Sequence, residues 1–474
     1  MAKRLFKSVF GIGLLIIACF FSFMFVGCSS STKFSENPLS DDVVVGNGSL
    51  AVTKGDYLYF VNGYTPYADV GSTNKEGKIT YAGLYRIKLD ENGNPEKVEA
   101  KLDNNGNEIF DGSRSLKNID ILASKVVGFE YMGIYIFGDY IYYASPNNEV
   151  DKNLTPTTQY IDFFRRKLDR SGAAEKIYTT KSEGSKVKYS MISVDGDVFL
   201  NVLDGNNLVV IKNKKTKVTV ESVSDVIFAP STRSDEQVPQ LYYDIYYTRN
   251  LSEEDTQTNG NVLCKFDLKT MTYGDVFKDN DSTITLKMIS NNNLFYEKTK
   301  QSDGTQKAKL YYASGVQSNN FVGETEVCSQ SYSNYYAKPS SNSVFVNDGS
   351  SILYIGNGTT KTIYSGSVTV IKAVGDYIYL ATDSNSILRV NFQEIINGNS
   401  VEPETVVSEK VKTGQDNFYL VTNNKLYYLS TNQTNDSVYL HMVDLNDNLT
   451  DYFVGVLNES DYDTQESETE DDEI

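Results

Sequence analysis

The sequence predicts an all-β fold, a β-propeller built from four-stranded antiparallel blades, and three observations indicate it. A short stretch recurs along the 474 residues, most clearly at 54–63, 137–146 and 374–383. The strand within each copy is apolar or aromatic on both faces. A second and different strand pattern follows several of the copies, while helical periodicity is nearly absent.

The recurring stretch has the composition of a strand that follows a tight turn. In the three clear copies Gly-Asp precedes an alternation of Tyr with branched or aromatic residues. Such turns are typical of hairpins, and most copies are preceded by another short apolar segment. Looser copies lie at 195–204, 242–250, 291–299, 349–358 and 423–431. Each copy is therefore expected to be the second strand of a unit.

These strands predict that each sheet is covered on both sides. In the last clear copy Tyr377 and Tyr379 would point to one face, and Ile378 and Leu380 to the other. The strands of an antiparallel sheet with one solvent-exposed face alternate apolar and polar residues instead. Radially stacked blades cover both faces of a short sheet.

A third and a fourth strand complete the unit. Segments beginning at Leu84, Phe163, Leu263, Ile387 and Leu440 share an apolar start, a mostly basic third position and a polar-then-apolar end. They predict the third strand, and the segment 217–222 predicts an outer fourth strand. Eight copies predict eight blades, with seven as the alternative.

Two segments carry a resemblance to a known family. Residues 378–383 (IYLATD) and 84–89 (LYRIKL) resemble the YWTD-type propeller of low-density-lipoprotein receptors. They resemble more closely the uncharacterised lipoproteins of low-GC Gram-positive bacteria that carry a propeller of this type. No copy reads YWTD and the chain has no Trp. The resemblance implies a binding or scaffold role and assigns no site residue.

The N-terminus resembles a bacterial lipoprotein signal peptide. Three basic residues precede an apolar run at 9–26, and Gly27-Cys28 with three serines follow it. In that family a peptidase cuts before the Cys, and a diacylglyceryl group is attached to its thiol. The resemblance therefore implies lipidation of Cys28 and anchoring of the chain to the extracytoplasmic face of the cell membrane.

Two alternatives to this cleavage site and this type of anchor exist. Cleavage before Cys19 would leave the apolar residues 20–26 where a soluble tether belongs, whereas cleavage before Cys28 leaves the polar residues 29–32. An uncleaved transmembrane anchor is the other alternative, because about 18 apolar residues can span a bilayer. Both anchors place the rest of the chain outside the cytoplasm.

The composition excludes several classes of function. The net charge of −18 is unsuited to nucleic acid, whose phosphates require clustered Lys and Arg. The single histidine, His441, excludes a multi-histidine metal centre and falls in a strand column that is otherwise apolar. Cys264 falls in the same column, and we expect Cys264 and Cys328 to be buried free thiols. No catalytic motif is present, so no catalytic or cofactor-binding residue is assigned.

Two stretches place oxygen ligands at alternate positions, as calcium loops do. They are 103–107 and 444–451, and neither has the Gly or Glu that completes such a loop. The same residue types form ordinary turns, so no metal site is assigned.

The expected organisation follows from these segments. It comprises a signal peptide at 1–27, a lipidated Cys and flexible tether at 28–42, a propeller at 43–458 and an acidic disordered tail at 459–474. The expected function is binding or scaffolding for a protein or a cell-envelope glycan. The alternative is a carboxylate-dependent enzyme acting on glycans, whose residues cannot be selected among 62 acids.

Overall fold

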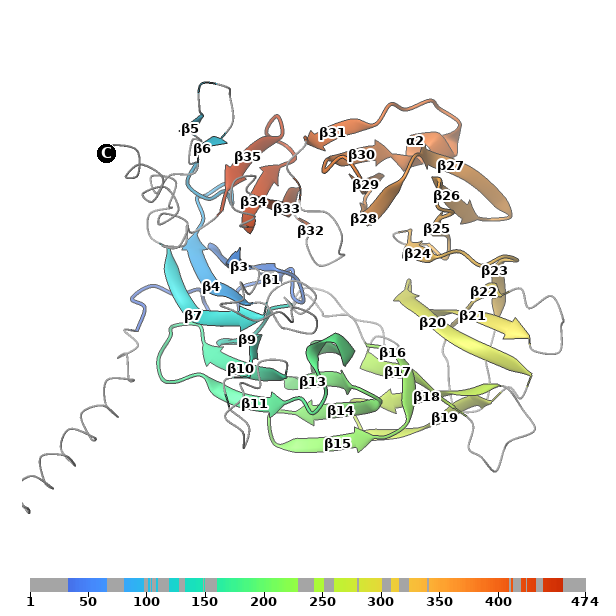
Figure 1. Ribbon diagram of the computed structural model, residues 1–474, viewed down its shortest axis with the longest axis horizontal. Coiled ribbons are helices and arrows are strands. Elements are labelled where there is room, and N and C mark those ends of the chain that lie inside the picture. The colour runs from blue at the N-terminus through green and yellow to red at the C-terminus, as the bar shows by residue number, and fades with distance from the viewer. Residues whose placement is uncertain are drawn as a thin grey trace, which may run out of the picture.

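The chain forms a ring of eight antiparallel four-stranded sheets, seen down its axis in the computed structural model of Figure 1. The predicted eight-bladed propeller is therefore confirmed. The structure describes residues 33–65, 81–97, 101–102, 104, 108–109, 119–127, 133–147, 149, 160–228, 243–250, 260–278, 281–300, 308–314, 324–338, 341–408, 411, 419–422, 424–431 and 438–454.

The first four blades follow one another along the chain. Blade 1 consists of β2 (Ala51–Lys54), β3 (Tyr57–Thr65), β4 (Tyr81–Lys88) and β7 (Asp120–Val127), with β1 (Val44–Val45) paired to β2. Blade 2 consists of β8 (Tyr135–Phe137), β9 (Tyr140–Pro146), β10 (Ile161–Lys167) and β11 (Glu175–Thr179). Blade 3 consists of β12 (Val187–Val194), β13 (Asp197–Asp204), β14 (Asn207–Lys212) and β15 (Thr216–Val220). Blade 4 consists of β16 (Val223–Ile227), β17 (Asp244–Asn250), β18 (Asn261–Asp267) and β19 (Thr272–Lys278).

The last four blades repeat this order. Blade 5 consists of β20 (Ser282–Ser290), β21 (Asn293–Lys300), β22 (Lys309–Ser314) and β23 (Thr325–Cys328). Blade 6 consists of β24 (Asn334–Ala337), β25 (Val344–Asn347), β26 (Ser351–Gly356) and β27 (Thr359–Ser365). Blade 7 consists of β28 (Val368–Val374), β29 (Tyr377–Thr382), β30 (Ile387–Asn391) and β31 (Glu404–Val407). Blade 8 consists of β32 (Tyr419–Thr422), β33 (Lys425–Thr431), β34 (Val438–Asp444) and β35 (Thr450–Phe453).

Among the described residues, a short hairpin, a helix and a 3₁₀ turn lie outside the blades. The pair β5 (Lys101–Leu102) and β6 (Glu108–Ile109) forms a small hairpin between β4 and β7. The helix α2 (Phe392–Asn397) follows β30, where Asn391 caps its first turn and Gly398 ends it in a left-handed conformation. A single 3₁₀ turn, η3 (Gly184–Lys186), precedes β12.

The predicted strand positions hold in all blades but one. The five segments predicted as third strands are β4, β10, β18, β30 and β34, and the predicted outer strand 217–222 overlaps β15. The prediction for 349–358 is wrong, because these residues form β26, the third strand of blade 6, and β25 is the second. Both strands are apolar and flanked by turn residues, so only the sheet pairing distinguishes their places.

Side chains from neighbouring blades form the core, as the two-faced apolar strands predicted. Tyr59, Tyr246, Tyr296, Tyr427 and Tyr428 are fully buried, so these tyrosines pack in the core. In the best copy Ile378, Leu380 and Tyr379 are buried as expected. Tyr377 is instead 37% exposed, and it is the first residue of β29, directly after the Gly375-Asp376 turn.

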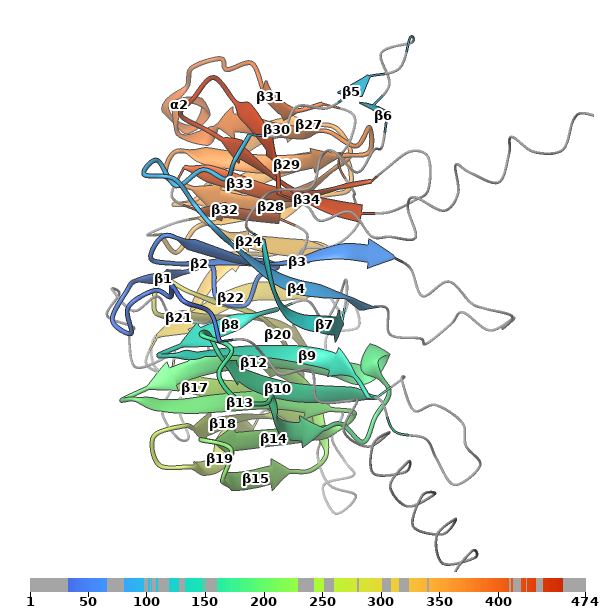
Figure 2. The same ribbon diagram turned by 90° about the vertical axis from the view of Figure 1, so that its left-hand side faces the viewer.

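The turn between the first two strands lies on the same face of the ring in the blades whose turn the structure describes. Figure 2 shows the ring edge-on, with the β2–β3 turn (Gly55-Asp56) on its left side, where the dark-blue N-terminal residues also lie. We call this side the turn face. The turns before β9, β13, β21, β29 and β33 occupy the equivalent place in their blades. Figure 1 shows the first strands near the axis and the fourth strands at the rim.

The ring closes without exchange of a strand, because blades 1 and 8 are each built from their own segment. One backbone pair, Tyr64 with Val438, joins β3 to β34. Lys425 on β33 donates to Asp444 of the same blade and to Asn94, which follows β4 in blade 1. All three side chains are buried. This polar contact and a shared apolar core therefore hold the first blade to the last.

Asp244, at the start of β17, is expected to make the stability depend on pH. Burial raises its carboxyl pKa to about 6, although Lys265 lies 3.3 Å away and opposes the shift. The folded pKa exceeds the unfolded value, so the protein loses stability as the pH rises from about 4 to about 7. We expect Asp244→Asn to stabilise the fold by about 1–2 kcal/mol at about pH 7.5 and to have no benefit near pH 4.

Urea denaturation at the two pH values measures this difference. The matched control is Asp275→Asn, which removes a half-exposed carboxylate of the same blade and should show no such gain at neutral pH. A loss of stability for Asp244→Asn at neutral pH would mean that the contact with Lys265 outweighs the cost of burial.

Candidate functional site

The predicted lipidation site Cys28 lies outside the described residues, and the described chain begins at Lys33. Residues 33–42, which belong to the predicted tether, lie against the turn face of blades 1 and 2, and we call them the strap. Among the described residues, the helices are too short to cross a membrane. The strap is the part of the described propeller that connects to the predicted anchor.

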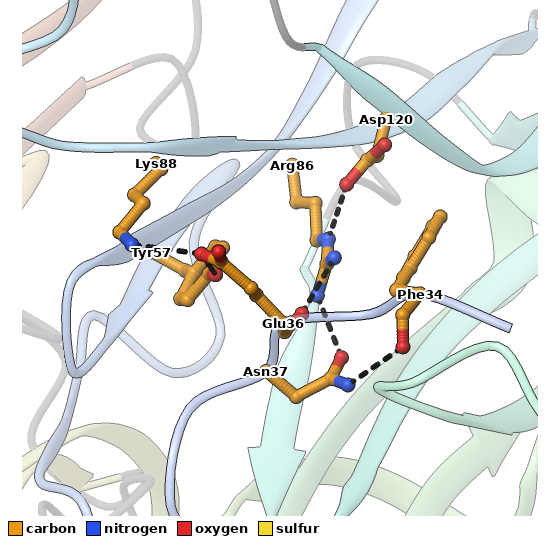
Figure 3. A network of polar contacts seen from close by, with 7 residues as sticks. All are labelled: Phe34, Glu36, Asn37, Tyr57, Arg86, Lys88 and Asp120. Atoms are coloured by element: carbon orange, nitrogen blue, oxygen red, sulfur yellow. Dashed lines mark hydrogen bonds and ion pairs between the residues drawn. The ribbon is translucent and has the colours of Figure 1, made fainter.

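Arg86 of β4 holds the middle of the strap (Figure 3). Its side chain is 3% exposed, and its Nε donates to Asp120 Oδ2 at 2.8 Å. The other guanidinium nitrogens donate to two acceptors of the strap, Asn37 Oδ1 at 2.8 Å and the Glu36 carbonyl at 2.9 Å. The guanidinium plane lies 3.7 Å from the centre of the Phe34 ring. One arginine therefore joins the strap to both β4 and β7.

The inner part of the strap joins blades 1 and 2. Lys54 Nζ donates to the carbonyl of Ser40 in the strap and to that of Gly138 in the β8–β9 turn. Just beyond the strap, Asn47 exchanges two hydrogen bonds with the backbone of Ile136. The strap and the residues after it are thus hydrogen-bonded to both blades on the turn face.

The outer end of the strap contacts the β10–β11 turn of blade 2. The Phe34 backbone N–H donates to the Asp169 carbonyl at 2.9 Å, and Lys33 pairs with the Asp169 carboxylate at 3.3 Å. Arg170 lies with its guanidinium 5.8 Å from the centre of the Phe34 ring. The described chain therefore begins at this turn.

A basic depression lies beside the same turn. Its volume is about 380 Å³, and its polar lining includes Arg165, Arg166 and Lys167 of β10 with Ser171 and Glu175. The single carboxylate, Glu175, is paired with Arg165 at 2.9 Å and also with Lys214. These two cations lower the pKa of Glu175, Lys214 having the larger effect. The lining therefore carries a net positive charge in a chain of net charge −18.

Two arginines at this place have unused donors. Arg166 Nη1 donates to the Leu122 carbonyl at 2.6 Å. In the part of the chain that the structure describes, the buried Nε atoms of Arg166 and Arg170 have no acceptor. Among the described residues no carboxylate pairs with Arg166, Lys167 or Arg170. The sequence analysis missed this cluster, although residues 165–170 contain four basic residues and could have indicated it.

His441 is a packed strand residue, as predicted. It is 4% exposed on β34, between the rings of Tyr428 and Phe453, and its Nδ1 lies 3.2 Å from an Asp451 oxygen. Cys264 and Cys328 are free, and the prediction of free thiols is confirmed. The expected burial is confirmed for Cys264 and is wrong for Cys328, which is half-buried. Burial raises the pKa of Cys264 to about 12, which leaves its thiol unreactive.

Of the two stretches that resemble calcium loops, the structure describes the oxygen-bearing residues of the second. Residues 103, 105 and 107 lie outside the described part. In the second stretch Asp444 pairs with Lys425, and Asp451 accepts from Tyr428 and faces His441. These carboxylates are therefore occupied by neighbouring side chains. Within the described residues no group of three His, Cys, Asp or Glu side chains is placed to hold a metal ion.

A second, smaller pocket lies between blades 2 and 3 and is lined by residues that include Tyr142, Arg165 and Lys214. Glu175 is the single carboxylate in the linings of the two pockets. A pair of acids of the kind that a glycosidase needs is thus not found in either lining.

Comparison with known proteins gives likenesses of fold alone. No family model and no curated protein matches the sequence. The Dos1 propeller is similar over 86% of this chain and 94% of its own, with a TM-score of 0.43 and 10% identity. The β-propeller domain of the Trilobed protease from Pyrococcus furiosus is similar over 78% and 97%, with a TM-score of 0.37 and 9% identity.

An acylaminoacyl peptidase from Pyrococcus horikoshii is similar over 54% of this chain, with a TM-score of 0.35 and 12% identity. The matched part covers 44% of that peptidase, so this chain spans less than half of its length. None of these three likenesses transfers a ligand or an activity to this protein.

Proposed function

We propose that the protein is a lipoprotein of the extracytoplasmic membrane face whose propeller binds or scaffolds a protein or a cell-envelope glycan. The observation that carries the proposal is the N-terminal order of basic residues, apolar run, Gly27-Cys28 and polar linker. The loose likeness of 84–89 and 378–383 to YWTD-type propellers is consistent with a non-catalytic role.

Under this proposal, the position of the strap determines which face of the propeller lies toward the membrane. Four residues lie between Cys28 and Lys33, and an extended chain over these five residue-to-residue steps spans at most about 18 Å. An acylated Cys28 would therefore hold the outer end of the strap within that distance of the membrane surface. Because the strap is clasped to blades 1 and 2, the turn face would be turned toward the membrane and the opposite face away from it. The opposite face would then be the one presented to a partner.

Lipidation is tested by the mass and the location of the protein in a bacterial host. We expect the wild-type chain to lose residues 1–27, to gain a diacylglyceryl group on Cys28 and to sediment with membranes. Cys28→Ser should abolish both the mass gain and the cleavage, while Cys264→Ser, which removes a buried thiol instead, should change neither. An unmodified Cys28 in a membrane-bound wild-type protein would favour an uncleaved transmembrane anchor.

The partner is sought by cross-linking in cells followed by purification of the tagged full chain. A specific protein or glycan that is recovered with the wild type and lost with Cys28→Ala supports binding at the envelope. Recovery of nothing specific, together with turnover of a glycan substrate by the purified protein, would favour the carboxylate-dependent enzyme.

A further inference from the structure

The basic depression of blade 2 and the start of the strap both lie at the β10–β11 turn. Arg165, Arg166 and Lys167 line the depression, and Arg170 lies in the next turn beside Phe34 of the strap. The nearby carboxylate Asp169 is paired with Lys33 and accepts from the Ser171 backbone at 2.8 Å. The local acids are therefore occupied, and the positive charge of Arg166, Lys167 and Arg170 is not neutralised by the described residues.

We propose that Arg166, Lys167 and Arg170 form a phosphate-binding site that takes the headgroup of an anionic phospholipid in the anchoring membrane. An anionic oxygen placed there would be attracted by three cations that no described carboxylate neutralises. Burial, and to a smaller extent the neighbouring Arg170 guanidinium, lower the pKa of Arg166, and an anionic oxygen would offset the repulsion between the two guanidinium groups.

The choice of a lipid phosphate rests on the anchoring proposed above, whereas the site itself does not. The outer end of the strap, at most about 18 Å from an acylated Cys28, touches the turn that carries Arg170. Two of the large apolar side chains exposed on the described surface, Leu39 and Val43, lie in the strap or directly after it and are 67% and 47% exposed. Cationic and apolar side chains together are typical of a surface that contacts a bilayer interface.

The backbone conformation of the β10–β11 turn allows a substitution that removes a charge and should leave the fold intact. Arg170 has a φ of 59°, a left-handed conformation that Asn adopts with less strain than Arg. Arg170→Asn therefore removes the charge without disturbing the turn, and Lys167→Gln changes an exposed side chain. The matched control is Lys269→Gln combined with Lys300→Gln, which removes two exposed charges from blades 4 and 5.

The test uses the full chain in lipid nanodiscs, into which it inserts through either an acylated Cys28 or the apolar segment 9–26. Hydrogen exchange of residues 166–172 is compared between discs of phosphatidylcholine alone and discs with equal parts of phosphatidylglycerol. We expect residues 166–172 to exchange at least tenfold more slowly in the anionic discs. Each basic residue near an anionic surface strengthens binding to that surface roughly fivefold. Lys167→Gln/Arg170→Asn should lose this protection, and the control double variant should keep it.

The remaining outcomes separate the sources of phosphate. Protection of the same residues by inorganic phosphate in neutral discs, equal to that in anionic discs, would assign the site to a soluble phosphate and overturn the lipid. Protection by a soluble glycerol-phosphate polymer alone would assign it to an envelope polymer. Equal exchange under all conditions would overturn the site itself. The mass of Cys28 is read on the same samples, so failure of the anchor and failure of the site are distinguished.

Discussion

Lys425→Met is expected to open the ring between blades 8 and 1. The substitution leaves the buried Asp444 carboxylate without its cation and removes the hydrogen bond to Asn94, the polar contact that spans the junction. Breaking one side of a buried ion pair lowers the free energy of unfolding by about 3–5 kcal/mol. Urea denaturation measures this loss, and hydrogen exchange should locate it in β2–β4 and β32–β35.

A second variant shows whether the cost comes from the unpaired carboxylate. Lys425→Met/Asp444→Leu removes both charges, and we expect it to recover part of the stability. Burial opposes ionisation of Asp444, but the bonds from Lys425 and from the Asn446 backbone keep its pKa below the usual range. The ion pair therefore stabilises the protein above about pH 4 and loses its effect at more acid pH, where the deficit of Lys425→Met should shrink.

Lys298→Met is the control for ring closure. It breaks the partly buried pair of Lys298 with Glu324 inside blade 5, where no closure contact exists. We expect a smaller loss, confined to that blade. An equal loss in both variants, with no faster exchange at the junction of blades 1 and 8, would contradict a closing role for Lys425.

Arg86→Leu is expected to release the strap from the propeller. The variant loses the bonds to Asp120, Asn37 and the Glu36 carbonyl and the stacking on Phe34. We expect a loss of about 2–4 kcal/mol in the free energy of unfolding, less than for a fully buried pair because Asp120 is partly exposed. Limited proteolysis should cleave residues 33–42 of the variant and spare the wild type.

Lys88→Leu is the matched control, because Lys88 binds the same strap through Glu36. That pair, at 2.8 Å, is exposed to solvent, and such pairs contribute little. We expect no measurable change in stability or in cleavage of the strap. If the strap of Arg86→Leu stays protected, the pairing of β1 with β2 and not the guanidinium holds it in place.

The site shows a clear limit of prediction from sequence. His441 and Cys264 could be assigned to the core from their strand column, because strand periodicity fixes which positions face a neighbouring blade. The strap could not be predicted, because residues 33–42 have the polar composition of a linker and their order depends on Arg86, about 50 residues away. Likewise, the run 165–170 is basic in the sequence, but the sequence does not say which of its cations have a carboxylate beside them.

The sequence by itself determined the class of fold, the repeat and the number of blades. Periodicity and turn chemistry are local, so eight copies of one strand pattern sufficed. The tertiary structure alone decided the closure by Lys425 and Asn94, which are 331 residues apart, and the place of 349–358 within blade 6. It also decided that the strap lies on the turn face beside arginines that pair with no carboxylate among the described residues. Those outcomes depend on contacts between segments distant in the chain, and such contacts leave no local pattern in the residues that make them.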